Sequence, residues 1–191
     1  DFDNNGTHDI VLSKQYQGEY VPVRGMECSS QQMPFIQEKF KTYEAFANAK
    51  LVDVYGDKLN TSESEEVNEF KSLLLLNKGQ GNFSFSALPN EAQLFPIMNT
   101  VFLDVNKDGF EDAIVGGNIY GTEVETPRLD AISGLVLLSN KKNGYTPMPW
   151  SESGLLLDGN IKDLAHLNTP KGSLIIASQN NGPLLVHRKK P

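Results

Sequence analysis

Two short acidic loops constrain this chain more than any other feature of its sequence. They read DFDNNGTHD from residue 1 and DVNKDGFED from residue 104, with oxygen-bearing side chains at alternate positions and glycine at the sixth. Calcium takes six to eight oxygen ligands, and alternate residues of a tight loop point toward one centre. Gly6 and Gly109 permit a sharp bend that a side chain would strain. The loops therefore predict two calcium sites.

The predicted ligands follow the alternate positions. In the second loop they are the side chains of Asp104, Asn106, Asp108 and Asp112 with the main-chain carbonyl of Phe110, and in the first loop those of Asp1, Asp3, Asn5 and Asp9 with the carbonyl of Thr7. Three carboxylates in one loop repel one another without a cation. Magnesium fits such large, irregular ligand sets poorly. The alternative is an Asx-rich turn without metal, which two copies of matched spacing disfavour.

The twelfth position of each loop indicates the architecture. An EF-hand loop closes there with a bidentate Glu and continues into a helix. Here Leu12 and Val115 occupy that position, within the β-rich runs DIVLS and DAIVGG. We therefore expect the ninth-position Asp to be the last ligand and each loop to join two strands.

A second similarity extends this repeat. Residues 72–89, SLLLLNKGQGNFSFSALP, and residues 134–150, GLVLLSNKKNGYTPMPW, each combine an apolar run, a Gly/Asn/Lys turn, an aromatic residue and a proline. This pattern is typical of a β-hairpin. The unit becomes strand, acidic loop, strand, longer connection, strand, tight turn, strand, which is a four-stranded antiparallel sheet of the size of a β-propeller blade.

The distance between the loops predicts an insertion. They begin 103 positions apart, and removing residues 29–70 leaves about 61, a reasonable blade length. We predict one partial propeller domain over residues 1–191. Its predicted parts are a first blade from 1–28 and 71–95, a helical insertion at 29–70, a second blade at 96–152, and a degenerate last blade at 153–191. In that last blade NTPKG replaces the acidic loop, and no metal is expected there.

The insertion is expected to hold short helices. SSQQMPFIQEKF and TYEAFANAKLVDVYG predict two, capped at their starts by Ser30 or Thr42, with Gly56 ending the second. Phe46, Ala49, Leu51 and Val52 give that second helix a rough apolar stripe. The acidic stretch 61–70 predicts a third short helix.

At these motifs the chain resembles the FG-GAP or VCBS repeat family, whose blades carry D-x-[DN]-x-[DN]-G-x-x-D between their first two strands, as in integrin α-subunit propellers. The resemblance covers residues 1–28 and 71–188. ECSSQQMPF, GNIYGTEVETPRLDA and QNNGPLLV are also similar to bacterial proteins related to cartilage acidic protein and carrying ASPIC/UnbV segments. The resemblance implies the last blades of a seven-bladed propeller, calcium as a structural ion, and a place outside the cytoplasm: extracellular, periplasmic or at the cell surface of a bacterium.

The connection 116–134 is the other candidate site. It forms a possible binding rim with the polar and aromatic residues Asn118, Tyr120, Glu123, Glu125, Arg128 and Asp130. Arg128 has two acidic candidates for an ion pair, Asp130 and Glu125, and such a pair would only order the loop. His8, His166 and His187 lie in different parts of the repeat, and Cys28 has no nucleophile context, so neither type of residue predicts a site.

Composition narrows the function classes. The net charge is -7, from 24 acidic and 17 basic residues, which opposes a general nucleic-acid surface. The sequence has no apolar run long enough for a membrane span and no nucleotide-binding or hydrolase motif. Because the chain opens inside a motif at Asp1, we expect it to be a piece of a longer protein, completed by the remainder of the propeller or by oligomeric copies.

The sequence favours an extracellular binding or adhesion scaffold for a protein or carbohydrate ligand. The alternatives are the rim of a propeller enzyme acting on polysaccharide, with Glu123, Glu125 and Asp130 converging, and a partner-docking module that uses the helical insertion.

Overall fold

The structure is a computed structural model that describes residues 1–123 and 126–188. The chain divides into two compact units, Asp1–Val67 and Asn68–Pro191. The described residues are mainly β and form four small, open antiparallel sheets together with short helices, and none of these sheets closes on itself. A propeller is therefore not seen among them.

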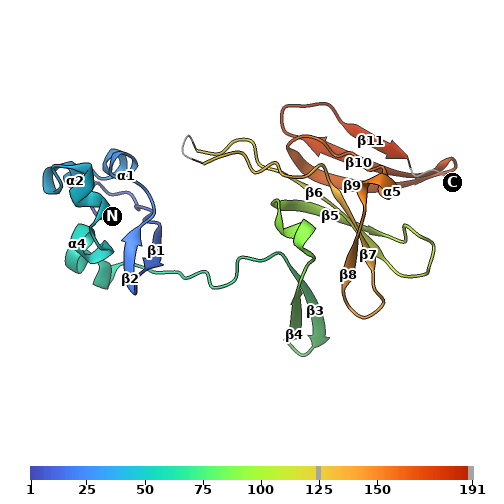
Figure 1. Ribbon diagram of the computed structural model, residues 1–191, viewed down its shortest axis with the longest axis horizontal. Helices are drawn as coiled ribbons and strands as arrows, with labels where there is room; N and C mark the ends of the chain where they lie inside the picture. The colour runs from blue at the N-terminus through green and yellow to red at the C-terminus, as the bar shows by residue number, and fades with distance from the viewer. Residues whose placement is uncertain (124–125, 189–191) are drawn as a thin grey trace. The chain divides into compact units, whose positions relative to one another are not determined.

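The first unit joins an acidic loop, a hairpin and a helical cluster (Figure 1). Its elements are β1 (Ser13–Tyr16), β2 (Glu19–Pro22), α1 (Met26–Gln32), α2 (Phe35–Lys39), α3 (Tyr43–Ala47), α4 (Leu51–Tyr55) and the 3-10 helix η1 (Gly56–Thr61). Its core is formed by Phe2, Met33, Ile36, Phe46, Ala49, Val54 and Tyr55. The acidic loop thus contributes to this core through Phe2.

The helical region differs from the sequence prediction in its continuity. The first predicted helix breaks at Pro34, because the residue before a proline avoids the helical region, and Met33 lies outside that region at φ −131° and ψ 89°. The second predicted helix is divided into α3 and α4 by residues 48–50.

The predicted caps have mixed outcomes. Thr42 caps α3 by accepting a hydrogen bond from the Ala45 N–H, and α4 ends at Gly56, where φ is +58°, as predicted. Ser30 was wrongly predicted as a cap, because it lies inside α1 and its hydroxyl donates to the Glu27 carbonyl. The apolar stripe holds for Phe46 and Ala49, but Val52 is 56% exposed.

The third predicted helix, over 61–70, is wrong. The 3-10 helix ends at Thr61, and the residues after Ser62 have no helical turn before β3. Three glutamates at 63, 65 and 66 repel one another, and Val67 and Phe70 are exposed, so a helix here would bury no apolar face.

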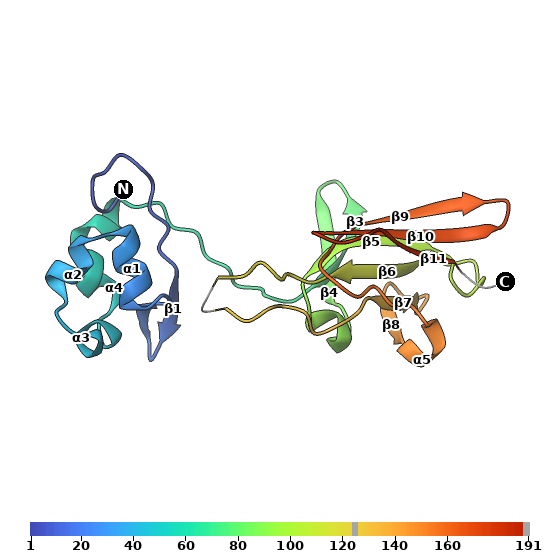
Figure 2. The same cartoon turned by 90° about the horizontal axis from the view of Figure 1, so that it is seen from above.

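The second unit contains the larger sheets (Figure 2). Its elements are β3 (Leu73–Gly79), β4 (Asn82–Ala87), η2 (Asn90–Gln93), β5 (Ile97–Leu103), β6 (Asp112–Gly117), β7 (Leu135–Ser139), β8 (Tyr145–Met148), α5 (Trp150–Ser153), β9 (Ile161–Thr169), β10 (Gly172–Gln179) and β11 (Leu185–Arg188). The strand orders are β3-β4, β5-β6-β7-β8 and β11-β10-β9, all antiparallel.

The four-stranded sheet β5–β8 has the predicted repeat order: strand, acidic loop, strand, long connection, strand, tight turn, strand. It is packed on both faces. One face meets β9 and β10 through Ile114, Val136, Ile161, Leu164 and Ile175, and the other meets Ala92 and Phe95. Because both faces are covered, every residue of β6 is buried. This explains why its sequence is a continuous apolar run.

Residues assigned to the first predicted blade form two separate two-stranded sheets, β1-β2 and β3-β4, among the described residues. Their union in one blade stays a prediction. In the β3–β4 turn both Gln80 and Gly81 have positive φ, 52° and 76°, as a two-residue type I′ turn requires. The region of the predicted last blade is the three-stranded sheet β9–β11, with NTPKG at the turn between β9 and β10.

Candidate metal sites

The second loop connects β5 and β6 and is shaped by its own side chains. The carboxylate of Asp104 accepts hydrogen bonds from the N–H groups of Asp108 and Gly109, at 3.0 and 2.8 Å. Asn106 Oδ1 accepts from the Asp108 N–H, and Asp108 Oδ1 accepts from the Phe110 N–H. Lys107 and Gly109 take positive φ, 63° and 87°. These bonds fold the backbone tightly around the alternate oxygens.

The first loop has the same conformation. Asp1 accepts from the N–H groups of Asn5 and Gly6, at 2.8 and 3.0 Å, Asp3 accepts from the Asn5 N–H, and Asn5 Oδ1 accepts from the Thr7 N–H. Positive φ falls at Asn4 and Gly6, 60° and 88°. Each of these bonds and angles has its counterpart at the same position of the second loop. The conformation is therefore a property of the nine-residue pattern, because the surroundings of the two loops differ.

The ninth-position aspartates anchor the loops in different ways. In both loops this residue accepts from the N–H of the second position, Asp9 from Phe2 and Asp112 from Val105. The other oxygen of Asp112, a fully buried residue, accepts from the main-chain N–H of Ser139 on β7 at 2.8 Å. The other oxygen of Asp9 accepts from the side chain of Gln32 on α1 at 3.1 Å. A strand thus holds one loop and a helix side chain holds the other.

The carboxylates converge most closely in the first loop. One oxygen from each of Asp1, Asp3 and Asp9 lies within 4.8 Å of the others, and in the described part of the chain no other three acidic, histidine or cysteine side chains do so. Three converging carboxylates at this separation suit a hard cation such as calcium.

In the second loop a lysine already faces one predicted ligand. The ammonium of Lys141, from the β7–β8 turn, lies 3.1 Å from Asp108 Oδ2 and 5.1 Å from the centre of the Phe110 ring. Burial alone would raise the pKa of Asp108, but the hydrogen bonds from the Phe110 N–H and from Lys141 outweigh it, so the pKa of this carboxyl lies below its ordinary value. Asp108 is therefore held in the charged form that a metal ligand needs.

The residues of the predicted binding rim do not all lie at the surface in the structure. Asn118 is 3% exposed, and its amide donates to the carbonyls of Ile132 and Gly159, at 2.8 and 3.1 Å, so it holds loops together beneath the surface. The guanidinium of Arg128 lies 4.8 Å from the centre of the Tyr120 ring, and Ile119 pairs with Leu129. These contacts join the two described ends of the connection to each other.

The acidic members of that rim are not shown to form a catalytic group. Glu123 and Asp130 are exposed, and Glu125 lies outside the described residues. Their predicted convergence stays a prediction. Among the histidines, His8 is exposed and His166 lies half-buried in β9.

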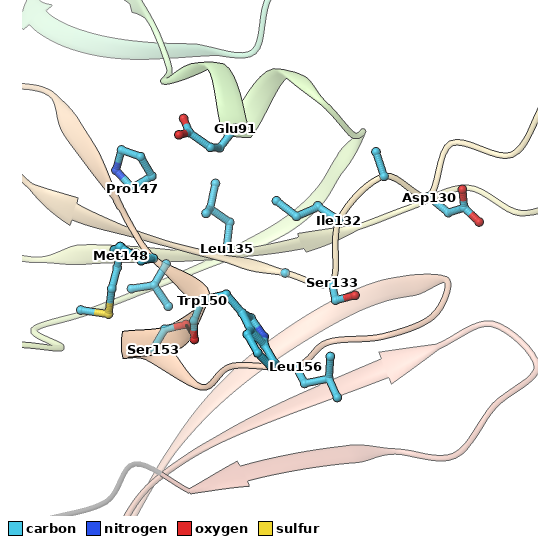
Figure 3. A pocket seen from close by; sticks show the side chains of 14 residues that line it. Glu91, Asp130, Ile132, Ser133, Leu135, Pro147, Met148, Trp150, Ser153 and Leu156 are labelled. Atoms are coloured by element: carbon cyan, nitrogen blue, oxygen red, sulfur yellow. Dashed lines mark hydrogen bonds between the residues drawn. The ribbon is translucent and has the colours of Figure 1, made fainter.

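A pocket of about 630 Å³ lies between η2, β7, β8 and α5, and Asp130 is the one residue of its lining that the sequence analysis had singled out. Figure 3 shows Trp150 and Leu156 on one side, Glu91 and Pro147 on the other, and Leu135 between them. Sequence reasoning missed this pocket because its lining comes from separate segments that the β7–β8 sheet and α5 bring together. Its lining is mostly apolar, with carboxylates only at its ends.

No helix in the described ranges is long and apolar enough to cross a bilayer. An exposed apolar face on residues 42–55 would favour the partner-docking alternative. This region turns Phe46, Ala49, Val54 and Tyr55 into its own core and leaves Tyr43 and Val52 exposed.

Comparison with family models, curated proteins and solved structures finds no match for this chain.

Proposed function

We propose that the chain is a calcium-binding β-sheet repeat segment of the FG-GAP or VCBS type. The observation that supports this most directly is the shared geometry of the two loops. Two stretches far apart in sequence have positive φ at the same positions and the same hydrogen bonds from side-chain oxygens to main-chain N–H groups. A chance Asx-rich turn does not explain such a match over nine positions.

Calcium acts structurally in this proposal. The ion neutralises carboxylates that otherwise repel one another, most of all Asp1, Asp3 and Asp9, and so fixes the loop against the core beneath it. The chain then serves as a rigid scaffold for a protein or carbohydrate ligand outside the bacterial cytoplasm, within a larger propeller. The mainly antiparallel architecture of the described residues is consistent with this role.

Calcium titration of the full chain tests the proposal. After removal of metal with EDTA, added calcium should raise the melting temperature, since a ligand that binds only the folded state stabilises it by about 2.7 kcal/mol at 100 times its dissociation constant. Calorimetry on Asp3→Ala and Asp104→Ala should show the loss of one site each, since each variant removes a carboxylate from a different loop.

Asp158→Ala is the matched control, because Asp158 is an exposed acid outside both loops. It should bind calcium as the parent does. A melting curve that is the same in EDTA and in millimolar calcium would contradict the proposal.

A further inference from the structure

The pocket beside Trp150 is lined by residues of the second unit alone and shares no residue with either acidic loop. Its volume of about 630 Å³ lies within the range of about 300 to 1,000 Å³ that is typical of small-molecule sites. Leu135 and Val136 on β7 belong to its lining and are 7% and 4% exposed. Because β7 pairs with β6 on one edge and with β8 on the other, this part of the lining is held in place.

Trp150 forms one side of the pocket, and its backbone is fixed (Figure 3). It begins the one-turn helix α5 directly after Pro149, and its carbonyl accepts a hydrogen bond from the Gly154 N–H at 2.9 Å. The indole nevertheless remains 62% exposed, and Leu156 beside it is 47% exposed. Exposed apolar side chains that gather beside a pocket are typical of a ligand-binding groove.

Glu91 lies on the other side of Leu135, on the 3-10 helix η2, which is also anchored (Figure 3). Its neighbour Ala92 is fully buried, and the Gln93 side chain accepts a hydrogen bond from the Ser72 N–H at 2.7 Å. The Glu91 side chain is exposed and has no hydrogen bond or ion pair within the described residues. A fixed turn thus holds an unpaired carboxylate at the pocket.

The charged side chains of the lining are all acidic. Among the described residues that line the pocket, Glu91 and Asp130 carry charge, and there is no lysine, arginine or histidine. Asp130 is also exposed and without a hydrogen bond or ion pair in the described part of the chain. The lining therefore combines an apolar surface with negative charge and offers no basic side chain to an anion.

We propose that this pocket binds a small organic cation, an ammonium group carried on an apolar body. The apolar body packs against Leu135 and Ile132, and the ammonium lies at the Trp150 side. The face of an indole attracts a cation through its ring quadrupole. The unpaired carboxylates of Glu91 and Asp130 add a negative field of the matching sign. Because the lining is held by strand pairing and by two anchored turns, binding orders few side chains.

This site does not rest on the calcium proposal, since none of its residues is a predicted metal ligand. It can therefore be tested in EDTA, by titrating the full chain with hexyltrimethylammonium. Trp150 is the only tryptophan, so its fluorescence reports directly on occupation of the pocket. The cation should shift this fluorescence with a dissociation constant of about 1 mM, the affinity expected for a ligand of its size.

Two ligands of similar size separate charge from apolar contact. Octan-1-ol has no charge and octanoate has the opposite charge. Each should bind at least about threefold more weakly than the cation, because neither gains the attraction of the indole face and the carboxylates. Equal affinity of the chain for the cation and for octan-1-ol would overturn the proposal, since the pocket would then select apolar surface alone. So would the absence of cation binding at about ten times the expected dissociation constant.

Glu91→Gln removes one charge of the pocket and keeps the size of the side chain. It should weaken binding of the cation at least about threefold and leave binding of octan-1-ol unchanged. Glu111→Gln is the matched control, because it removes the same charge from an exposed glutamate outside the lining, and it should bind both ligands as the parent does. Equal weakening in the two variants would overturn the proposal, because the net charge of the chain would then explain the binding.

Trp150→Leu tests the contribution of the indole by NMR titration of the ligand signals. The substitution keeps an apolar side chain, and it should weaken binding of the cation at least about fivefold. Phe83→Leu is its control, since Phe83 on β4 is 59% exposed and lies outside the pocket. It should leave binding unchanged. Unchanged affinity in Trp150→Leu would overturn the assignment of the cation to this pocket.

Discussion

The two acidic loops share one backbone conformation but are fixed by different parts of the protein. The second loop joins two paired strands, and its ninth-position Asp112 is buried against the main chain of β7. The first loop rests on a helical core through Phe2, and the Gln32 side chain takes the place of a strand N–H. The nine-residue pattern therefore specifies its own shape, while the anchor comes from whatever element the fold supplies.

Substitution of the ninth-position aspartate should give the largest difference between the loops in the free energy of unfolding. Asp112 is fully buried, and Asp112→Ala leaves the main-chain N–H groups of Val105 and Ser139 without their acceptor. The substitution should therefore lower the free energy of unfolding of the second unit by about 3 kcal/mol or more. Asp9→Ala, at a half-buried position, should cost about 1 to 2 kcal/mol.

The unfolding of both units in urea can be followed in the same sample. The single tryptophan, Trp150, reports on the second unit by fluorescence, and helical circular dichroism reports mainly on the first, which contains α1 to α4. Asp112→Asn keeps one carbonyl acceptor and should be less damaging than Asp112→Ala. Equal losses for Asp9→Ala and Asp112→Ala would show that the anchors are equivalent.

Substitution of the second residue of each loop should give the next largest difference in the free energy of unfolding. Phe2 is 8% exposed, and its ring centre lies 4.7 Å from that of Tyr55, so Phe2→Ala opens a cavity in the helical core and should cost about 3 kcal/mol. Val105 is only half-buried at the core between the sheets, so Val105→Ala should cost about 1 kcal/mol. Thermal melts followed by the same two signals measure both, and a larger loss for Val105→Ala would contradict the comparison.

The parts of the fold that could be predicted from the sequence are those coded locally. The glycine at the sixth loop position, the apolar runs of β6 and β7 and the turn residues Gln80 and Gly81 each determine the conformation of a few neighbouring residues. Thr42 and Gly56 marked helix ends for the same reason. These features need no knowledge of distant parts of the chain.

What could not be predicted depends on contacts between distant segments. Nothing in the sequence near Gln32 marks it as the partner of Asp9, and nothing near Lys141 marks its approach to Asp108. Asn118 looked like a surface residue because it follows a strand in a polar stretch, but the chain around residues 132 and 159 covers it. The large pocket beside Trp150 arises in the same way, from packing and not from a motif.

Alkaline pH should lower the stability of the two units to different extents, and this effect is smaller than those of the substitutions above. Burial, together with the charge of Asp9, raises the pKa of Tyr55 to about 12, against about 10 in an unfolded chain. Between these values the unfolded chain loses a proton that the folded chain keeps. The first unit therefore has its full stability below about pH 10 and loses stability as the pH rises toward 12.

Tyr55→Phe is the control for this titration and should remove most of the pH dependence of the helical signal. Tyr145 in the second unit also has a raised pKa, through burial first and then the charges of Glu111 and Asp112, but it is half-exposed. The second unit should therefore respond less than the first. A first unit that is equally stable at pH 9 and pH 11 would contradict the assignment to Tyr55.

The smallest expected effect concerns the lysine beside the second loop. A cation that binds there must displace the Lys141 ammonium, which lies 3.1 Å from Asp108 Oδ2 and is half exposed. Exposed ion pairs are worth about 0.2 to 1 kcal/mol, so Lys141→Met should tighten calcium binding at the second loop by about 1.5- to 5-fold. Calorimetry on the full chain measures this, with Lys142→Met as the control, since that exposed neighbour has no ion pair with an acidic residue among the described contacts. Unchanged or weaker calcium binding in Lys141→Met would mean that the ammonium and the ion occupy different places.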